Sequence, residues 1–332
     1  MHDIVVIGAS AGGVEALTTI ARQFSPSLKA AVFVVVHVSP DSAGLLPAIL
    51  NRTSPVPARQ AEDGAAIEPG NIYVAPPDRH LMLEPGEIRV TRGPRHNRHR
   101  PAIDLLFRTA ARHYGSRVVG VVLTGFLDDG SSGLLAIKNA GGIAIVQDPA
   151  DAAVAAMPRN ALQQVQPDYC VPASQIGDLI NQLASKEGRP MVAELKGNKA
   201  QEGSEQKRNQ TAFTCPDCHG TIWEVEENGE LRFECRVGHA YSPEGMGNAN
   251  QEDVERSLWI ALRTLEESAA LEQRLADLAA DRNRHSAHEF YRQKAQQRKQ
   301  HAAIIRDFLV GSTRRGNEVN GDKGSRQLER VS

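Results

Sequence analysis

The fold of this chain is decided by residues 3–13, Asp3-Ile4-Val5-Val6-Ile7-Gly8-Ala9-Ser10-Ala11-Gly12-Gly13. Apolar, β-forming residues run directly into a Gly-x-Ser-x-Gly pattern, and apolar residues at helical spacing follow over 11–24. A strand, a sharp turn and a helix in this order form the context of a nucleophile elbow. Small residues around Ser10 let the turn close tightly and leave the hydroxyl projecting from the strand end. The start of the helix directs backbone N–H groups to the same space, where an oxyanion would form.

The alternative for these glycines is a phosphate-binding turn, which would make nucleotide binding the function. Dinucleotide-binding turns read Gly-x-Gly-x-x-Gly, whereas Ser10 stands here in place of the second glycine. The next expected strand ends in Val36-His37-Val38-Ser39, so it offers no acidic residue for a ribose. The turn therefore favours a nucleophile, with a phosphate or purely structural turn as the alternative.

Composition limits the classes of protein that need to be considered. The 332 residues allow one large domain and a smaller second one. Because 38 basic residues nearly balance 40 acidic ones, we expect no nucleic-acid partner. The sequence has no apolar run of membrane-spanning length and no signal region at its start, so we expect no membrane insertion and a cytoplasmic location.

Strand-like and helical segments alternate from Asp3 to about Ser185. Expected strands cover 3–8, 31–38, 71–75, 118–124, 143–147 and 168–171, and expected helices cover 11–24, 44–51, 101–114, 131–140, 158–165 and 174–185. Several strands are continuously apolar, as strands covered on both faces are, and residues 81–92 predict a hairpin beside the sheet. The pattern predicts an α/β fold with a doubly wound, mostly parallel sheet, which binds ligands at the carboxyl ends of its strands.

The composition changes near residue 186, and the domain boundaries follow from that change. We expect a catalytic domain over 1–185, a flexible polar linker over 186–211 and a compact cysteine-bearing module over 212–245. Leucines and alanines at helical spacing predict a helical region over 251–310, either one long helix or a helical hairpin. The polar residues 311–332 predict a disordered tail.

Three chemically complementary side chains follow three of the expected strands. Ser10 follows the first strand, His37 ends the second, and the adjacent Asp128 and Asp129 follow strand 118–124. A neutral imidazole can take the proton of a serine, and a carboxylate fixes the tautomer and stabilises the imidazolium. The chain order Ser, His, Asp differs from the Ser, Asp, His order of α/β-hydrolases, so that superfamily is disfavoured.

Residues 3–185 resemble the CheB family, the protein-glutamate methylesterases of bacterial chemotaxis. The resemblance rests on separate motifs in the family's order: Ile7-Gly8-Ala9-Ser10 with Gly12-Gly13, the strand end at His37, Ala75-Pro76-Pro77-Asp78-Arg79-His80-Leu81, Arg100-Pro101-Ala102-Ile103-Asp104-Leu105-Leu106-Phe107, and Leu123-Thr124-Gly125 through Asp129-Gly130. The resemblance implies that Ser10 is the nucleophile, His37 the general base and acid, and Asp129 the supporting carboxylate. The choice of Asp129 over Asp128 comes from the family pattern. The backbone N–H groups of Ala11 and Phe126 would form the oxyanion hole.

The chain departs from well-known members of that family in two respects. Those members carry an N-terminal receiver domain whose phosphorylation uncovers the site, whereas this sequence starts directly at the catalytic domain. We therefore expect a receiver-less member without that switch. Many members have Thr where this chain has Ala11, and a backbone donor does not need that side chain.

Three further features of the first domain have either two alternative interpretations or a purely structural one. The basic segment 89–100 is either a solvated loop, or a guide for an acidic substrate surface or a lid over the site. We expect His80 to be a structural loop residue near the site, and Cys170 to be a buried small hydrophobe.

The cysteine module contains a metal-binding pattern. Cys215, Cys218, Cys235 and His239 have the spacing C-x2-C-x16-C-x3-H, with β-like segments between the two halves. So small a module buries little core, and a closed zinc site can contribute about 10–16 kcal/mol. We expect a structural zinc-ribbon-like module; His219 is an alternative ligand that would strain the turn beside Cys218.

The function that the sequence predicts is hydrolysis of glutamate γ-methyl esters on chemoreceptor-like signalling proteins, and the resemblance also implies glutamine deamidation. No catalytic cofactor is expected. A catalytically idle scaffold that acts through its zinc ribbon and helices is the alternative. We expect the C-terminal region to recruit a signalling partner. Because every candidate catalytic residue precedes Gly130, the chemistry is expected to be independent of the C-terminal module.

Overall fold

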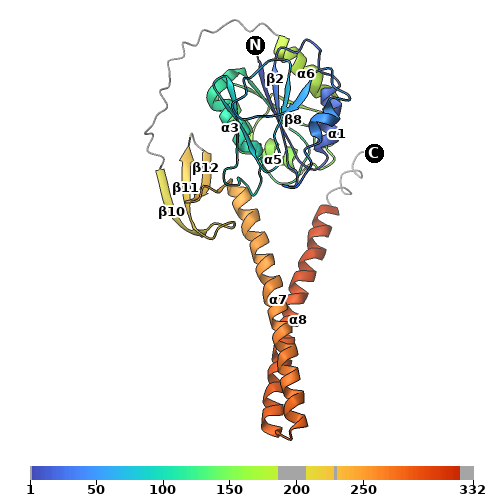
Figure 1. The fold of residues 1–332 in the computed structure, drawn as a ribbon, viewed down its shortest axis with the longest axis vertical. Helices are drawn as coiled ribbons and strands as arrows, with labels where there is room; N and C mark the ends of the chain where they lie inside the picture. Colours follow the sequence, from blue (N-terminus) through green and yellow to red (C-terminus); the bar gives the residue numbers. More distant parts are fainter. Residues whose placement is uncertain (1, 186–206, 228–229, 322–332) are drawn as a thin grey trace, which may run out of the picture. The chain divides into compact units, whose positions relative to one another are not determined.

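The computed structural model describes residues 2–185, 207–227 and 230–321. The chain divides into two compact units, Met1–Gly247 and Asn248–Ser332 (Figure 1). The expected linker over 186–206 and the end of the expected tail, 322–332, lie outside the described residues.

A seven-stranded sheet forms the centre of the first unit, in the order β3-β4-β2-β1-β7-β8-β9. Every pairing in it is parallel, which confirms the predicted fold class. The strands are β1 (Ile4–Ala9), β2 (Ala31–Val36), β3 (Ala58–Gln60), β4 (Ile72–Val74), β7 (Val118–Val122), β8 (Ile143–Gln147) and β9 (Tyr169–Val171). β1, β2 and β7 are buried along their whole length, which is why their sequences are unbroken apolar runs.

Helices cover both faces of this sheet, and alternate residues of β1 contribute to two separate cores. Val5 and Ile7 belong to the core that includes α1 (Gly13–Ala21) and α6 (Ala173–Ser185). Ile4 and Val6 belong to the opposite core, whose helices are α3 (Ile103–Tyr114), α4 (Ser131–Asn139) and α5 (Ala156–Gln164). Figure 1 shows α1 and α3 on opposite sides of the strands. A short helix α2 (Leu46–Leu50) and a 3-10 turn (Gly115–Arg117) complete this part.

The predicted hairpin is present, but one strand of the seven-stranded sheet was missed and one burial prediction was wrong. β5 (His80–Glu84) and β6 (Glu87–Thr91) pair antiparallel and pack against the core that contains α3. The missed strand is β3, whose three residues Ala-Arg-Gln have no β-forming pattern. Cys170 was expected to be buried, yet it is exposed, because β9 is the edge strand of the sheet.

The cysteine module is a four-stranded antiparallel sheet of β10 (Lys207–Thr214), β11 (Thr221–Glu227), β12 (Glu230–Cys235) and β13 (Ala240–Tyr241). It begins before the predicted boundary at 212, because residues 207–210 pair with β11 and are not linker.

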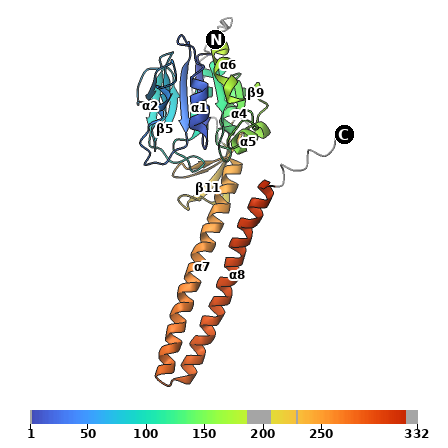
Figure 2. The same cartoon turned by 90° about the vertical axis from the view of Figure 1, so that its right-hand side faces the viewer.

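The helical region is a hairpin, which resolves the two alternatives left by the sequence. α7 (Pro243–Asp281) and α8 (His285–Gly321) lie side by side in Figures 1 and 2. Their shared core contains Leu262, Ala302 and Leu309, and Arg298 pairs with Glu272 at 2.9 Å. The helical backbone continues to Gly321, so residues 311–321 are not an unstructured tail.

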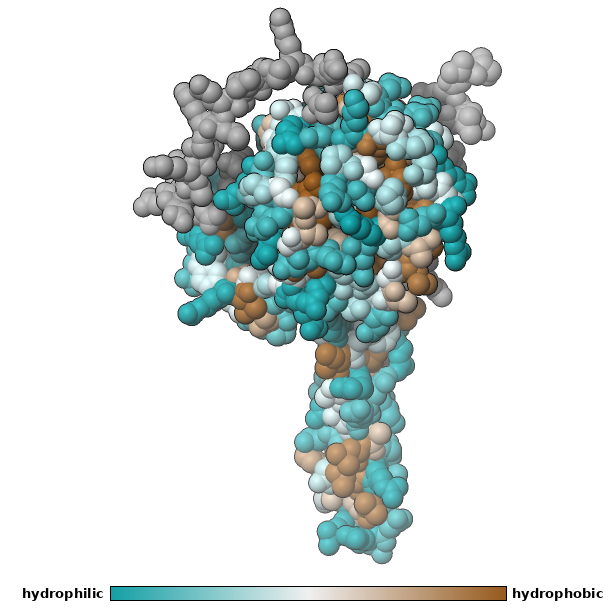
Figure 3. All heavy atoms as spheres, turned by 45° about the horizontal axis from the view of Figure 1, so that its top comes forward, coloured by the Kyte–Doolittle hydropathy of each residue, from teal (hydrophilic) through white to brown (hydrophobic). Residues whose placement is uncertain are grey.

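Apolar side chains remain exposed on this second unit, as the brown spheres on the helices in Figure 3 show. The exposed residues on α7 include Val254, Trp259, Ile260, Leu271 and Leu278. In the part of the chain that the structure describes, no helix has the length and apolar character needed to cross a bilayer.

Gly8→Ala is expected to destabilise the first unit. A Cβ at Gly8 would lie 2.2 Å from Ile103 Cγ2, so β1 and the start of α3 would have to separate. Overpacking of this kind costs about 1–3 kcal/mol of unfolding free energy. Calorimetry of the full chain measures the unfolding temperature of Gly8→Ala. Gly247→Ala is the control, because an added Cβ there meets no atom within 4 Å. Equal unfolding temperatures for the two variants would contradict this packing.

Candidate active site

Ser10 lies directly after β1, in the turn that leads into α1. Its backbone N–H donates to Thr124 O at 3.0 Å, and its carbonyl accepts from Gly13 N at 2.9 Å. Gly12 has a φ of +77°, which few other residues tolerate. A Cβ on Gly125 would lie 2.7 Å from Ser10 Cβ, so both glycines are needed for the serine to fit between the ends of β1 and β7.

His37 is the neighbour of Ser10 on the next strand. Ala9 pairs with Val36 in the parallel register of β1 and β2, and His37 N continues the ladder by donating to Ala9 O at 3.1 Å. Ser10 and His37 therefore occupy matching positions just past two adjacent strands. This geometry agrees with the expectation, made from their positions at strand ends, that both residues reach the same edge of the sheet.

The His37 imidazole is hydrogen-bonded to Asp129. Its Nε2 lies 2.8 Å from Asp129 Oδ2, and the two side chains are only 8% and 1% exposed. An ionised carboxylate can only accept, so Nε2 carries the proton and Nδ1 carries the lone pair. Nδ1 is buried and has no hydrogen-bond partner among the described residues. The nitrogen that can accept a proton is therefore Nδ1.

Asp129 is held at the amino end of α3. Its Oδ2 accepts from Ile103 N at 2.7 Å and its Oδ1 from Asp104 N at 3.1 Å. Burial alone would raise its pKa, but the hydrogen bond and charge of His37, aided by Ile103 N–H, hold the pKa of Asp129 below its ordinary value. The neighbouring Asp128 does not bond to His37; its carboxylate accepts from Ser242 Oγ at 2.5 Å.

Asp104 is a buried residue of this site that the sequence analysis assigned no role. Its Oδ1 accepts from Gly130 N at 3.0 Å and from Gly133 N at 2.6 Å. These bonds tie the turn after Asp129 and the start of α4 to α3. Burial and, after it, the charge of Asp129 together raise the pKa of Asp104 to about 7. The only signal in the sequence was an acidic residue inside an apolar helical run.

The basic segment 89–100 packs onto His37, so the solvated-loop interpretation is wrong for its second half. The His99 ring stacks on the His37 ring with centroids 3.7 Å apart and planes 8° apart. Asn97 is buried, and its Nδ2 reaches Asp129 Oδ1 at 3.5 Å and Asp104 Oδ2 at 3.4 Å. Burial lowers the pKa of His96 to about 3 and that of His99 to about 4.

His80 is hydrogen-bonded to residues at both ends of the loop that contains His99, which agrees with the structural role expected for it. It is 1% exposed, and its Nε2 donates to Pro94 O at 2.8 Å while its Nδ1 accepts from Ala102 N at 3.3 Å. Arg100 binds Asp78 through two bonds of 2.6 and 2.9 Å. These contacts anchor both ends of the loop.

Two backbone donors next to Ser10 are uncommitted. In the described chain, neither the N–H of Ala11 nor that of Phe126 donates to another group. Ala11 directly follows Ser10, and Phe126 directly follows Gly125. The Phe126 side chain is 60% exposed. Donors of this kind can hold the oxygen of a tetrahedral intermediate.

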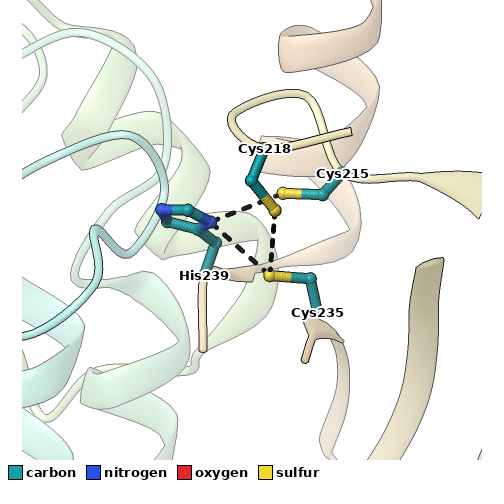
Figure 4. A group of neighbouring side chains, drawn as sticks. All are labelled: Cys215, Cys218, Cys235 and His239. Carbon is teal, nitrogen blue, oxygen red and sulfur yellow. Dashed lines mark hydrogen bonds between the residues drawn. The ribbon is translucent and has the colours of Figure 1, made fainter. Parts of the chain in front are cut away.

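The four predicted ligands of the cysteine module converge, as Figure 4 shows. The ligand atoms of Cys215, Cys218, Cys235 and His239 all lie within 4.8 Å of one another. The Cys218 and Cys235 sulfurs are 3.6 Å apart, and His239 Nδ1 is 3.5 Å from Cys235 Sγ. Ligands about 2.3 Å from a tetrahedral zinc would be separated by about 3.8 Å, so the donor set fits this metal. His219, the alternative ligand, is not a member of the cluster.

Comparisons with known proteins agree on one family. The model of the CheB methylesterase family matches residues 5–180, just over half of the chain. A putative protein-glutamate methylesterase/protein-glutamine glutaminase of Leptospira interrogans is 38% identical over 183 residues, which are 55% of this chain and 95% of the relative. A protein-glutamate methylesterase/protein-glutamine glutaminase of Salmonella typhimurium is 37% identical over 177 residues, and the match spans half of that relative.

A solved structure shows the same fold. The CheB methylesterase catalytic domain of Thermotoga maritima is 33% identical and superposes with a TM-score of 0.53, covering 55% of this chain and 99% of that domain.

The unfolding free energy is expected to fall as the pH is lowered from 6.5 towards 4. In the folded chain burial keeps the pKa of His99 at about 4, whereas an unfolded histidine titrates near 6.5. The unfolded state therefore binds more protons in this window, so stability increases with pH. His99→Asn should flatten the slope measured by urea unfolding at several pH values. His219→Asn makes the same change at an exposed histidine of this unit and should keep the wild-type slope. Equal slopes for both variants would contradict the assignment of the pH dependence to His99.

Proposed function

This chain belongs to the CheB methylesterase family, and we propose that it hydrolyses glutamate γ-methyl esters through Ser10, His37 and Asp129. The products would be methanol and a glutamate side chain. The observation that carries the proposal is the 2.8 Å bond between His37 and the buried Asp129, beside Ser10 at the same edge of the sheet.

Each side chain has a definite task in this reaction. Ser10 Oγ attacks the γ-carbonyl carbon while its proton passes to His37 Nδ1, and Asp129 stabilises the imidazolium that forms. The N–H groups of Ala11 and Phe126 bind the oxygen that becomes negative. His37 then returns the proton to the departing methoxide, which leaves as methanol. Water, activated by His37, hydrolyses the acyl-serine and restores the site.

The same attack can expel ammonia from a glutamine amide, so we include glutamine deamidation in the proposal. The printed names of the relatives combine both activities. The proposed substrates are methylated chemoreceptor-like signalling proteins, met in the cytoplasm, with the helical unit as a recruitment surface for a signalling partner. No cofactor is needed for the chemistry.

The two alternative functions have less support. Burial of an ionised carboxylate is costly. A catalytically idle scaffold would have no need for one hydrogen-bonded to an imidazole, as Asp129 is to His37. Nucleotide binding would use the N–H groups at the start of α1, but the adjacent His37–Asp129 pair has no task in it.

The C-terminal module is proposed to hold one structural zinc ion through Cys215, Cys218, Cys235 and His239. Two tight turns present the ligands: Cys215 N donates to Gly220 O at 2.7 Å, and Gly238 N donates to Cys235 O at 2.9 Å. Four ligands of this kind form a closed site, which stabilises a small module without taking part in chemistry.

Ser10→Ala is expected to lower kcat for methanol release by a factor on the order of 10⁴ or more, and the double variant with His37→Ala should lose no more, because the residues act as a unit. Methanol release from membranes bearing methylated receptors measures this. Ser39→Ala removes an exposed hydroxyl at the same strand edge and should keep wild-type activity. Near wild-type hydrolysis by Ser10→Ala would rule out this nucleophile.

The full chain is expected to contain about one zinc per molecule, and Cys215→Ser should lose it. Elemental analysis measures the zinc content, and the fluorescence of Trp223 on β11 reports the fold of the module. Cys170→Ser, at an exposed cysteine outside the cluster, should keep the metal. Zinc retained by Cys215→Ser, or lost by Cys170→Ser, would disprove the ligand set.

A further inference from the structure

The segment that follows the last ligand of the metal site runs along the loop over His37. We call residues 240–245 the clamp segment. Asn97 N donates to Ala240 O at 2.8 Å, and Ser242 N donates to Asn97 Oδ1 at 2.9 Å. His96 and Ala240 also form a β-bridge. The clamp segment therefore binds both the backbone and the side chain of Asn97.

Ser242 makes a second connection, to the residue before Asp129. Its hydroxyl donates to Asp128 Oδ2 at 2.5 Å and accepts from Gly245 N at 2.9 Å. Ser242 precedes Pro243, the first residue of α7, so the same hydroxyl caps this helix. Ser242 and Asp128 are 5% and 2% exposed. A buried carboxylate without this partner would be costly.

Both connections lead to the Asp129 carboxylate. Because Asn97 Oδ1 accepts from the clamp segment, the Nδ2 of the same amide must face Asp129 Oδ1 and Asp104 Oδ2. The Nδ2 group therefore donates to both of these neighbouring carboxyl groups. Asp128 acts through the chain, since it is bonded covalently to Asp129. The clamp segment thus restrains Asp129 from two sides.

Two glycines allow the clamp segment and the metal site to lie close to the loop over His37. A Cβ on Gly245 would lie 2.5 Å from Asn97 Oδ1, and one on Gly238 would lie 3.0 Å from Pro94 Cγ. Gly238 has a φ of +101° and lies between the ligands Cys235 and His239. Glycine is therefore required at both contacts with the loop.

The contacts support the site and do not block it. The clamp segment reaches Asp129 through Oδ1, whereas His37 binds Oδ2. Ser10 is partly exposed and Phe126 is 60% exposed, so the side on which substrate would bind stays accessible. The expectation that the chemistry is independent of the C-terminal module is not supported by this arrangement.

We propose that the clamp segment is a positioning element for the Asp129–His37 pair, and that metal bound by Cys215, Cys218, Cys235 and His239 holds it in place. The inference rests on the proposed function. His239 directly precedes Ala240, so the last ligand fixes the start of the clamp segment. Metal would then act on catalysis through structure, with no part in the chemistry.

Kinetics of the full chain test the role of Ser242. Ser242→Ala should lower kcat for methanol release about 10-fold or more with little change in KM, because misplacement of a catalytic group by about 1 Å can cost 10²-fold. Ser242→Thr keeps the hydroxyl and should restore most of the rate. Ser257→Ala, at an exposed serine of α7, should match wild type. A wild-type or increased kcat in Ser242→Ala would overturn the proposal.

A second readout does not depend on esterase activity. The His37 Nε2–H proton bonded to Asp129 is to be observed by NMR of ¹⁵N-histidine-labelled full-length protein, and assigned by its loss in His37→Gln. Ser242→Ala and zinc removal with a chelator should each shift or broaden this signal, and Ser257→Ala should not. An unchanged signal both in Ser242→Ala and after zinc removal would overturn the proposal that the clamp segment positions the Asp129–His37 pair. Absence of methanol release from wild type would disprove the proposed function and leave this test intact.

Discussion

The Asp129 carboxylate is buried and ionised, and a carboxylate can be kept in that state only when donors surround it. Two of the donors are the first N–H groups of α3, which also direct the positive end of the helix dipole at the charge. Asn97 Nδ2 is a third, and the fourth is His37, which makes the bond on which the proposed chemistry depends. The position of α3, the turn after β7 and the loop over His37 are all constrained by this one group.

The order of the central strands explains why distant residues meet at this point. β1 lies between β2 and β7, so Ser10 is flanked by His37 on one side and by the segment that leads to Asp129 on the other. All three strands are parallel and end at the same edge. Gly8 and Gly125 leave room for Ile103 and Ser10, which lets helix and serine approach the strands closely.

The buried polar residues around Asp129 are linked to one another by hydrogen bonds. Asp104 fastens the turn that carries Asp129, because it accepts from Gly130 N and Gly133 N. Asn97 lies between Asp104 and Asp129, and Ser242 holds Asn97 and Asp128. A carboxyl whose pKa burial raises to about 7 lies beside one that stays ionised, so the two do not both carry a full charge near neutral pH.

Local patterns in the sequence were sufficient for most of the fold. Continuous apolar runs identified the buried strands, and the spacing of the cysteines and His239 identified the four side chains that converge in the structure. β3 was missed because its three residues have no pattern of their own and form a strand only by pairing with β4. The burial of Cys170 was mispredicted because a short apolar segment does not reveal that its strand lies at the sheet edge.

By itself, the sequence determined most of the strands and helices, where a serine elbow lies and which three cysteines and histidine share a metal-ligand spacing, since these depend on residues near one another in the chain. The resemblance to the family had already selected Asp129 over Asp128 as the partner of His37. Only the tertiary structure decided that Asp104, Asn97 and Ser242 surround this pair. Ser242 and Asn97 are 145 positions apart, and their partners are chosen by burial. A polar residue that is removed from water must bond to whatever donor or acceptor the fold brings to it, and no local pattern of sequence encodes that choice.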